Sequence, residues 1–196
     1  MPCGFIRQAI YLASIACLTV PQTLLAQPGD GSPLSSLLSA MEGLESFRAN
    51  VTINGSLTGT LSYKKPANLH VQFSDGRILA SNGRTLWFYS PERAVTGKQD
   101  LKGMSEGIAG LVFGYEDFSS GKTIRLKSDS KRYSEIVIVL DANHLPKSLR
   151  LQSSGSGITE IVFSGVTTNL GLSASLFNYQ PPSSSMIIEN PLNYRE

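Results

Sequence analysis

The sequence is poor in the side chains from which catalytic and metal sites are commonly built. Its 196 residues include two cysteines, Cys3 and Cys17, and two histidines, His70 and His144. A protein metal site needs three or four ligands, and no cluster of candidate ligands occurs along the chain. His144 stands in a polar turn segment, and no Gly-x-Ser-x-Gly motif of a nucleophilic serine is present. We therefore expect no enzyme, no metal and no cofactor, and favour a module that binds something apolar.

Charge is also scarce. Charged residues make up 16% of the chain, and 17 basic residues nearly balance 15 acidic ones. The basic residues are scattered, with no run longer than the pair Lys64-Lys65, whereas nucleic-acid-binding proteins concentrate theirs in a stripe. The triplet Gly121-Lys122-Thr123 resembles the end of a phosphate loop, but Glu116 occupies the position of that loop's first glycine. The sequence argues against both a nucleic-acid partner and a phosphate loop.

The first 26 residues have the layout of an export signal. Arg7 precedes an apolar run from Ala9 to Val20, and a cleavage site fits after Ala26. The run is too short for a membrane span. We expect residues 27–196 to form one exported domain without cysteine, which must be stabilised by an ordinary core because no disulfide is available.

The same segment allows a second interpretation. Ser14-Ile15-Ala16-Cys17 loosely matches a lipid-attachment motif, and a lipid on Cys17 would anchor the protein to a membrane. The residues from Leu18 to Ala26 remain apolar, however, whereas the tether of a lipid-anchored protein is normally polar. This composition favours the cleaved, unanchored form.

A helix is predicted directly after the signal segment and a short linker. Ser32 is a suitable N-cap, and Pro33 follows at the first helical position. Apolar residues then recur at helical spacing on one face: Leu34, Leu37, Leu38, Met41 and Leu44. We therefore predict a helix over residues 33–46 that packs its apolar face on a core.

From Phe47 onward the period of the pattern changes to two, which is typical of β-strands. Short turns such as Asn54-Gly55 and Asp75-Gly76 join the segments, and connections of this length predict an antiparallel meander. About eleven strands form a sheet too long to stay flat, and we expect it to curl into a barrel or half-barrel. The predicted strands are 47–54, 57–64, 68–74, 77–81, 84–89, 93–101, 122–128, 133–140, 145–152, 157–164 and 176–180, with a short extended piece at 186–188.

Residues 104–113 interrupt this pattern. Ile108 and Leu111 belong to an apolar set at helical spacing, but three glycines punctuate the segment, and each weakens a helix by about 1 kcal/mol relative to alanine. We predict a short, marginal second helix here.

The stretch Trp87-Phe88-Tyr89 raises a specific question about the sheet. Neighbouring side chains of a strand point to opposite faces, so three consecutive aromatic residues place bulky apolar surface on both. We expect one face of this strand to look into the concave side of the sheet. The other face then requires cover from the C-terminal tail or from a neighbouring loop.

The strand that carries these aromatic residues also carries a family resemblance. Asn82-Gly-Arg-Thr-Leu-Trp-Phe-Tyr-Ser-Pro91, together with the earlier turn Lys64-Lys65-Pro66, resembles LolA, the family of periplasmic outer-membrane lipoprotein carriers. Ser46-Phe47-Arg48-Ala49 and the segment from Leu176 to Pro182 match the family's order of features. The resemblance extends from residue 33 to about residue 182.

This resemblance implies a mainly β (α+β) fold, an unclosed antiparallel β-barrel with a helical lid over a hydrophobic cavity. It implies a monomeric periplasmic carrier that shields the acyl chains of lipoproteins. Such a carrier receives its cargo from an inner-membrane ABC lipoprotein-release complex and passes it to an outer-membrane acceptor. Two alternatives stay open: a lipid-anchored, LolB-like acceptor on the same fold, and a structural or interaction module whose barrel is simply filled.

The resemblance also suggests site residues. We expect eight apolar side chains to face the cavity and bind acyl chains: Leu37, Leu38, Met41, Leu69, Val71, Trp87, Ile108 and Leu111. In studied carriers, the second basic residue of the basic-basic-Pro turn is an arginine that holds the lid shut. Here that residue is Lys65, which offers a compact charge instead of a planar fork. If Lys65 retains this role, its ammonium should reach backbone carbonyls of helix 33–46 or 104–113.

Overall fold

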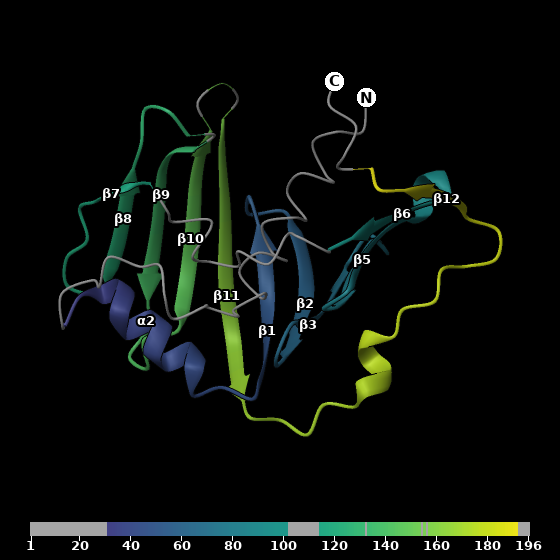
Figure 1. Cartoon of the computed structure of the whole chain (residues 1–196), viewed down its shortest axis with the longest axis horizontal. Coiled ribbons are helices and arrows are strands. Elements are labelled where there is room, and N and C mark those ends of the chain that lie inside the picture. Colours follow the sequence, from purple (N-terminus) through teal and green to yellow (C-terminus); the bar gives the residue numbers. More distant parts are fainter. Residues whose placement is uncertain (1–30, 102–113, 132, 154, 156, 192–196) are drawn as a thin grey trace.

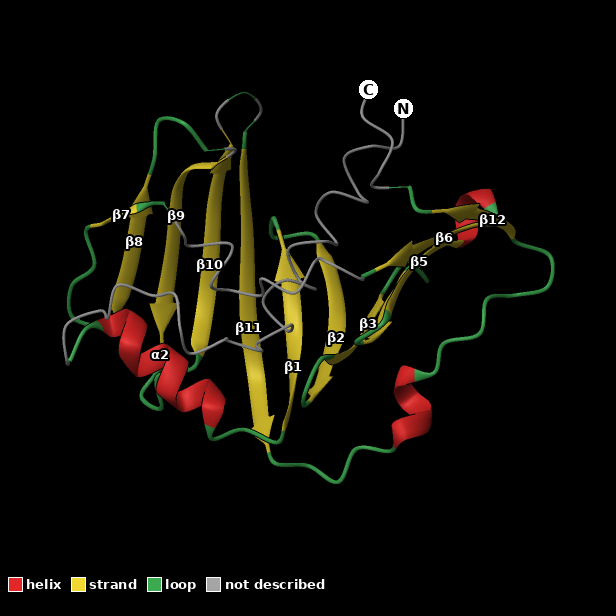
Figure 2. Cartoon of the chain, in the orientation of Figure 1, coloured by secondary structure: helices red, strands yellow, loops and turns green. Residues whose placement is uncertain are grey.

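The computed structural model describes residues 31–101, 114–131, 133–153, 155 and 157–191. Within these residues the chain forms one α-helix and twelve strands, accompanied by two short 3-10 turns (Figure 1 and Figure 2). The elements are α2 (Pro33–Glu42), β1 (Ser46–Ile53), β2 (Leu57–Lys64), β3 (Asn68–Phe73), β4 (Ile78–Asn82), β5 (Thr85–Ser90), η1 (Pro91–Arg93), β6 (Val95–Asp100), β7 (Glu116–Asp117), β8 (Thr123–Lys127), β9 (Tyr133–Leu140), β10 (Pro146–Ser153), β11 (Ile158–Thr168), η2 (Ala174–Phe177) and β12 (Met186–Glu189).

Helix α2 begins where the sequence predicts. The Ser32 hydroxyl accepts a hydrogen bond from the Ser35 amide at 3.1 Å, and Pro33 occupies the first turn, where its missing N–H costs nothing. The helix ends at Glu42, before the predicted end, because Ser46 already pairs with β2 as the first residue of β1. Its buried residues are Leu34, Leu37 and Met41.

The strands form one sheet in the order β12-β6-β5-β4-β3-β2-β1-β11-β10-β9-β8-β7. The neighbours pair antiparallel except β12, which runs parallel to β6. The register between β1 and β11 shifts between Arg48 and Asn50, an irregularity that bends a strand and increases its twist. In the described residues β7 and β12 stand at opposite ends of the order, so the predicted unclosed, mainly antiparallel sheet is confirmed.

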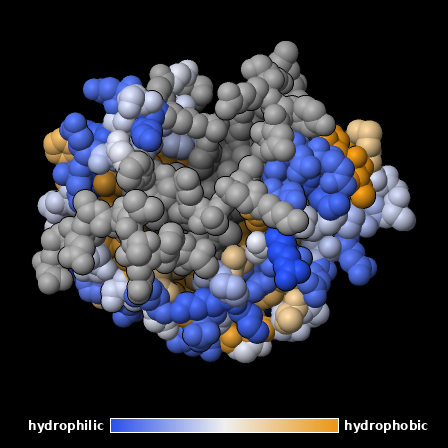
Figure 3. All heavy atoms as spheres, in the orientation of Figure 1, coloured by the Kyte–Doolittle hydropathy of each residue, from blue (hydrophilic) through white to orange (hydrophobic). Residues whose placement is uncertain are grey.

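The strand set differs from the predicted one at the two ends of the sheet. Glu116–Asp117 forms the short edge strand β7, which the sequence pattern did not indicate. At the other end, the expected extended piece at 186–188 is present as β12. Large exposed apolar side chains of this edge strand gather at the upper right of Figure 3: Met186, Ile187 and Ile188.

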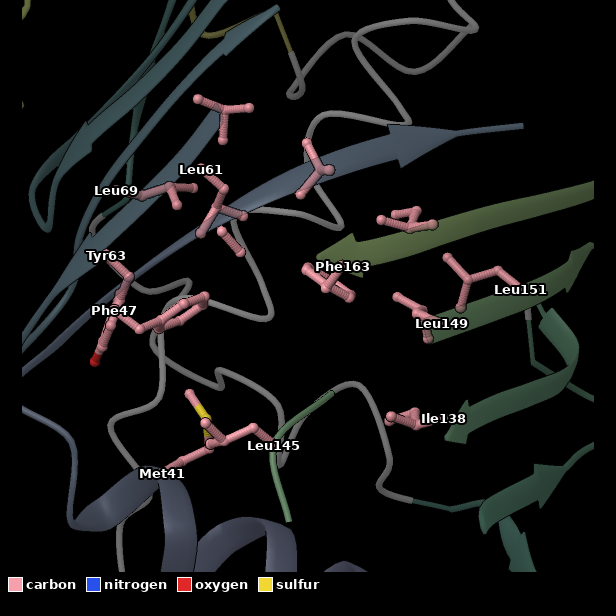
Figure 4. Close-up of a cluster of buried hydrophobic side chains, with 14 of the residues drawn as sticks. Met41, Phe47, Leu61, Tyr63, Leu69, Ile138, Leu145, Leu149, Leu151 and Phe163 are labelled. Carbon is pink, nitrogen blue, oxygen red and sulfur yellow. The ribbon is translucent and has the colours of Figure 1, made fainter. Parts of the chain in front are cut away.

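The inner face of the curled sheet carries the main apolar core. Side chains from β1, β2 and β3 on one half face side chains from β9, β10 and β11 on the other, so the sheet curves around a single cluster. Figure 4 shows this arrangement, with Met41 reaching into the cluster from α2. Helix α2 contacts β8 and lies across the lower ends of β8 to β10 in Figure 1.

The outer face of strands β1 to β6 is crossed by the segment that follows β11. We call residues 169–185 the strap. It begins on β1, where the Ser46 hydroxyl donates to the Leu170 carbonyl at 2.7 Å. It then crosses β2, where the Lys64 ammonium donates to the Leu172 carbonyl at 2.8 Å. These two bonds hold the strap against the sheet in place of strand pairing.

The strap continues across β3 to β6. Its 3-10 turn η2 contacts β3 and β4, and Phe177 in this turn is only 2% exposed. The Tyr179 ring then packs on β5, with its centroid 6.3 Å from that of Trp87 and 6.5 Å from that of Tyr89. The Ser185 hydroxyl meets the Thr96 hydroxyl of β6 at 2.9 Å, just before β12 begins. The expected cover of the aromatic strand is therefore the C-terminal tail.

The predicted strand at 176–180 is wrong. This segment forms the end of η2 and then irregular structure, with the Ser173 hydroxyl accepting from the Ser175 amide as a cap. The strands beneath it, β3 and β4, already have partners on both edges, so a segment lying on their face has no backbone groups to pair with. It is held by side-chain burial instead.

Burial of Phe177 predicts that the strap contributes to stability. Phe177→Ala should lower the free energy of unfolding by about 3 kcal/mol, at the lower end of the range for a buried phenylalanine because the strap can partly relax. Urea unfolding measures this loss. Phe118, which is 54% exposed, is the matched control, and Phe118→Ala should be nearly neutral. Equal losses in the two variants would contradict the covering role of the strap.

Candidate functional site

The inner face brings together four of the apolar residues expected at the site. Leu37 and Met41 of α2 and Leu69 and Val71 of β3 are all buried in the same cluster, and Leu38 packs against it half-buried. The helix pair and the strand pair lie far apart along the chain, and the curvature of the sheet makes them one apolar surface under the helix.

The seam between α2 and the sheet is tightly packed at the described residues that border it. A recess of about 10 Å³ lies there, lined by apolar side chains. A cavity of that size holds no more than about one water molecule. Its lining residues are Met41, Phe47, Leu145, Pro146, Phe163 and Val166. With α2 packed on the sheet, this seam therefore offers no room for a ligand at the described residues.

Trp87 does not share this surface, and its expected position facing the cavity is wrong. Residues that pair directly across neighbouring strands point to the same face of the sheet. Trp87 pairs with Ala80 of β4, and Ala80 pairs with His70 of β3. His70 lies between Leu69 and Val71 in β3, so it points to the face opposite to theirs. Trp87 therefore lies on the outer face, under Tyr179. Its strand neighbours Leu86 and Phe88 are the residues of β5 that point inward and are buried. Three aromatic residues in a row do not reveal which of them faces inward.

Two further expected site residues, Ile108 and Leu111, lie outside the described residues, as does the whole predicted helix 104–113. The structure places neither of them relative to the inner face.

Lys65 makes the contact that the sequence predicts for it. Its ammonium donates to the backbone carbonyl of Glu42, the last residue of α2, and lies 3.9 Å from the Glu45 carboxylate. The final carbonyls of a helix lack partners within the helix and carry the negative end of its dipole, so a cation is favourable there. The Lys65 side chain is 35% exposed, which limits the strength of the ion pair. The expected reach of Lys65 to helix 33–46 is confirmed.

The preceding residue, Lys64, holds the strap instead of the helix. Because successive side chains of β2 point to opposite faces, Tyr63 faces the inner core while Lys64 faces outward to the Leu172 carbonyl. The backbone amide of Glu45 is bound to the Asn169 side chain at 3.0 Å. The end of α2 and the start of the strap are thus both bound close to the Lys64-Lys65 pair. Sequence reasoning missed Lys64, although period-two alternation separates it from the apolar set.

The outer face contains two groups whose titration is altered by burial. Burial lowers the pKa of His70, because the charged imidazolium is poorly solvated there. Burial, followed by the nearby Tyr89, raises the pKa of Tyr179 to about 12. The Tyr179 hydroxyl is buried and has no hydrogen-bond partner among the described residues, so it contributes packing rather than a polar contact.

The described ranges contain neither a metal site nor a membrane-spanning helix. No three histidine, cysteine or acidic residues within them come close enough to hold a metal ion. None of the helices in these ranges has the length and hydropathy needed to cross a membrane.

These features define a class of protein: a half-open β-barrel with an apolar interior and a helix fastened across it. The family model for the outer membrane lipoprotein carrier protein LolA matches residues 46–180, from β1 into the strap, and the chain belongs to this family. The family expected from the aromatic strand and the basic turn is therefore confirmed.

Relatives with this description are distant. The chain is 28% identical over 105 residues to the outer-membrane lipoprotein carrier protein of Idiomarina loihiensis, which covers 48% of this chain and 52% of that protein. It is 25% identical over 128 residues to the protein of the same description from Alcanivorax borkumensis, covering 58% and 61% respectively. The matches thus span between about half and three-fifths of these curated relatives.

A solved structure agrees with the fold. The crystal structure of an uncharacterized conserved protein from Thermus thermophilus superposes with a TM-score of 0.52 at 11% identity. The superposition covers 80% of this chain and 96% of that one, and it supports the architecture alone.

The two lysines predict separable effects on the helix and the strap. Lys65→Leu should remove about 1 kcal/mol of local stability from α2 and speed amide exchange in its last turn about fivefold, leaving the strap unchanged. Lys64→Leu should do the reverse, loosening residues 170–176 and leaving α2 protected. Hydrogen exchange followed by mass spectrometry measures both segments in one experiment. Equal loosening of α2 in the two variants would contradict the separate roles.

Proposed function

We propose that this protein is a periplasmic carrier that shields the acyl chains of lipoproteins between the inner and the outer membrane. The observation that carries this proposal is the continuous apolar inner face, closed by a helix whose C-terminal end is fastened by Lys65. Family membership supports it. In this proposal residues 1–26 are an export signal, and residues 27–196 form one monomeric carrier domain.

The chemistry of the cargo explains why such a carrier is needed. Burying acyl chains is worth about 0.8 kcal/mol per methylene. Exposing three chains of roughly fifteen methylenes each to water therefore costs on the order of 35 kcal/mol of free energy. A lipoprotein cannot cross an aqueous compartment at that cost unaided. The carrier must cover the chains with surface that is itself buried when no cargo is present.

Helix α2 is suited to this exchange. Its residues Leu37, Leu38 and Met41 pack against the inner face, and the recess at the seam is only about 10 Å³. When acyl chains enter, they replace the helix side chains on Leu69 and Val71 and bury a similar apolar area. Because one apolar contact replaces another, the net free energy of loading stays small. The Lys65 contact, worth about 1 kcal/mol, favours the form in which α2 lies on the sheet.

A second candidate follows from the same packing. The inner residues are buried and the recess is small, which also fits a permanently filled interior, as in a structural or interaction module. A LolB-like acceptor is the other alternative, and it requires a lipid on Cys17. Intact mass spectrometry separates that form from a chain that begins near Gln27.

Fatty-acid binding distinguishes a carrier from a filled barrel. A fluorescent fatty acid should bind the purified mature protein saturably, and Leu38→Gln should weaken this binding about tenfold or more because a polar group then faces the chain. Ser39→Gln, at an exposed position of the same helix, is the matched control and should bind normally. Leu69→Gln tests the sheet side of the same surface. Absence of saturable binding in the unmodified protein would favour the filled module.

Transfer of cargo tests the role of Lys65. Lys65→Leu should accept a labelled lipoprotein from the inner-membrane ABC complex and pass it on poorly, because the closed form that expels the chains is less favoured. Transfer to membranes that contain the outer-membrane acceptor measures this, with Lys64→Leu as the control. Normal transfer by Lys65→Leu would place the control of α2 in other residues.

A further inference from the structure

A groove lies on the outer face of the sheet, where the strap leaves β11. Its volume is about 580 Å³, and it is lined by Arg48 of β1 and by residues 170–173, 175 and 176 of the strap. None of these residues belongs to the inner face that we propose for acyl chains. The volume falls in the range of small-molecule sites, roughly 300–1,000 Å³.

Arg48 provides a positive charge that no described acidic residue neutralises. Its Nε donates to the Ser62 hydroxyl at 3.2 Å, and Ser62 is only 3% exposed, so this bond ties the otherwise exposed guanidinium to a buried position of the sheet. Within the described part of the chain no carboxylate forms an ion pair with Arg48. The acidic residue Glu45 pairs instead with Lys65. The Nη atoms of Arg48 therefore remain available to a ligand.

The rest of the groove combines apolar and hydroxyl groups. Leu170, Leu172 and Leu176 supply its apolar wall. Ser173 and Ser175 stand at its surface with their hydroxyls 2.8 Å apart. A guanidinium beside an apolar wall is complementary to a molecule with an anionic head and a hydrocarbon body. It suits neither a fully polar ion, which would leave the leucines uncovered, nor a neutral hydrocarbon, which would desolvate Arg48 without replacing its hydrogen bonds.

We propose that this groove binds the phosphate head and first methylenes of an anionic lipid. The planar fork of an arginine matches phosphate oxygens with two parallel hydrogen bonds, and such charge-assisted bonds are stronger than neutral ones. The phosphate sits on the Nη atoms of Arg48, and the methylenes lie along Leu170 and Leu176. This site is separate from the inner face and does not depend on cargo carriage.

Three soluble probes separate the contributions of head and chain. Octyl phosphate carries both, octyl glucoside carries the chain with a neutral head, and inorganic phosphate carries the head alone. Titration calorimetry of the mature protein should give the tightest binding for octyl phosphate. Arg48→Gln should weaken octyl phosphate binding about tenfold or more and leave octyl glucoside unchanged, since the loss is that of a hydrogen bond to a charged group. Arg150→Gln, at an exposed position on the outer face of β10, is the matched control and should bind all three probes normally.

A second variant fills the groove without touching the charge. Ser175→Trp should also weaken octyl phosphate while leaving fatty-acid binding at the inner face intact, so that failure of this proposal and failure of the carrier proposal are distinguishable. Unchanged octyl phosphate binding in Arg48→Gln would overturn the site. Inorganic phosphate binding as tightly as octyl phosphate would overturn the lipid assignment.

Discussion

Much of this structure follows from one constraint: a strand of the sheet, β5, carries apolar side chains on both of its faces. In β5, Leu86 and Phe88 point inward while Trp87 points outward, and each set must be removed from water. The sheet satisfies the inner demand by curling until its two halves face each other, with α2 across the remaining opening. The strap covers the apolar side chains of the outer face, with Phe177 and Tyr179 lying over β3 to β5.

The two covers differ in how firmly they are held. The strap is fastened at successive strands, from Ser46 on β1 to Thr96 on β6, and then continues into β12, which pairs with β6. Helix α2 lies on the inner face through its apolar residues, and its C-terminal end is tied by the Lys65 contact to Glu42. The outer cover is therefore held at several strands and by strand pairing, whereas the inner cover is held by apolar packing and by the Lys65 contact. Because Lys64 and Lys65 are adjacent, one short turn anchors both.

This division suits the carriage that we propose. A carrier must offer a large apolar surface to its cargo and still be soluble when empty, and a helix that occupies the cargo's place meets both needs. The apolar residues of α2 and the acyl chains then compete for the same inner surface, so loading and release are balanced by small differences rather than by a deep binding site. In this proposal the helix moves while the strap stays bonded to the outer face. The outer face also carries the separate site that we propose at Arg48.

Most of the elements, and the family, could be predicted from the sequence. Period-two patterning located ten of the strands, Ser32 and Pro33 located the start of α2, and the run Trp87-Phe88-Tyr89 required a covered outer face. Local rules suffice for these features because they depend on neighbours along the chain. Which face of a strand lies inward depends on contacts between distant segments, and for this reason Trp87 lies on the outer face instead of at the expected site. Residues 176–180 pack on the face of the sheet because β3 and β4 already have partners on both edges. Alternation along β2 predicts that Lys64 and Tyr63 point to opposite faces, but the contact of Lys64 with the strap depends on how segments far apart in the sequence come together.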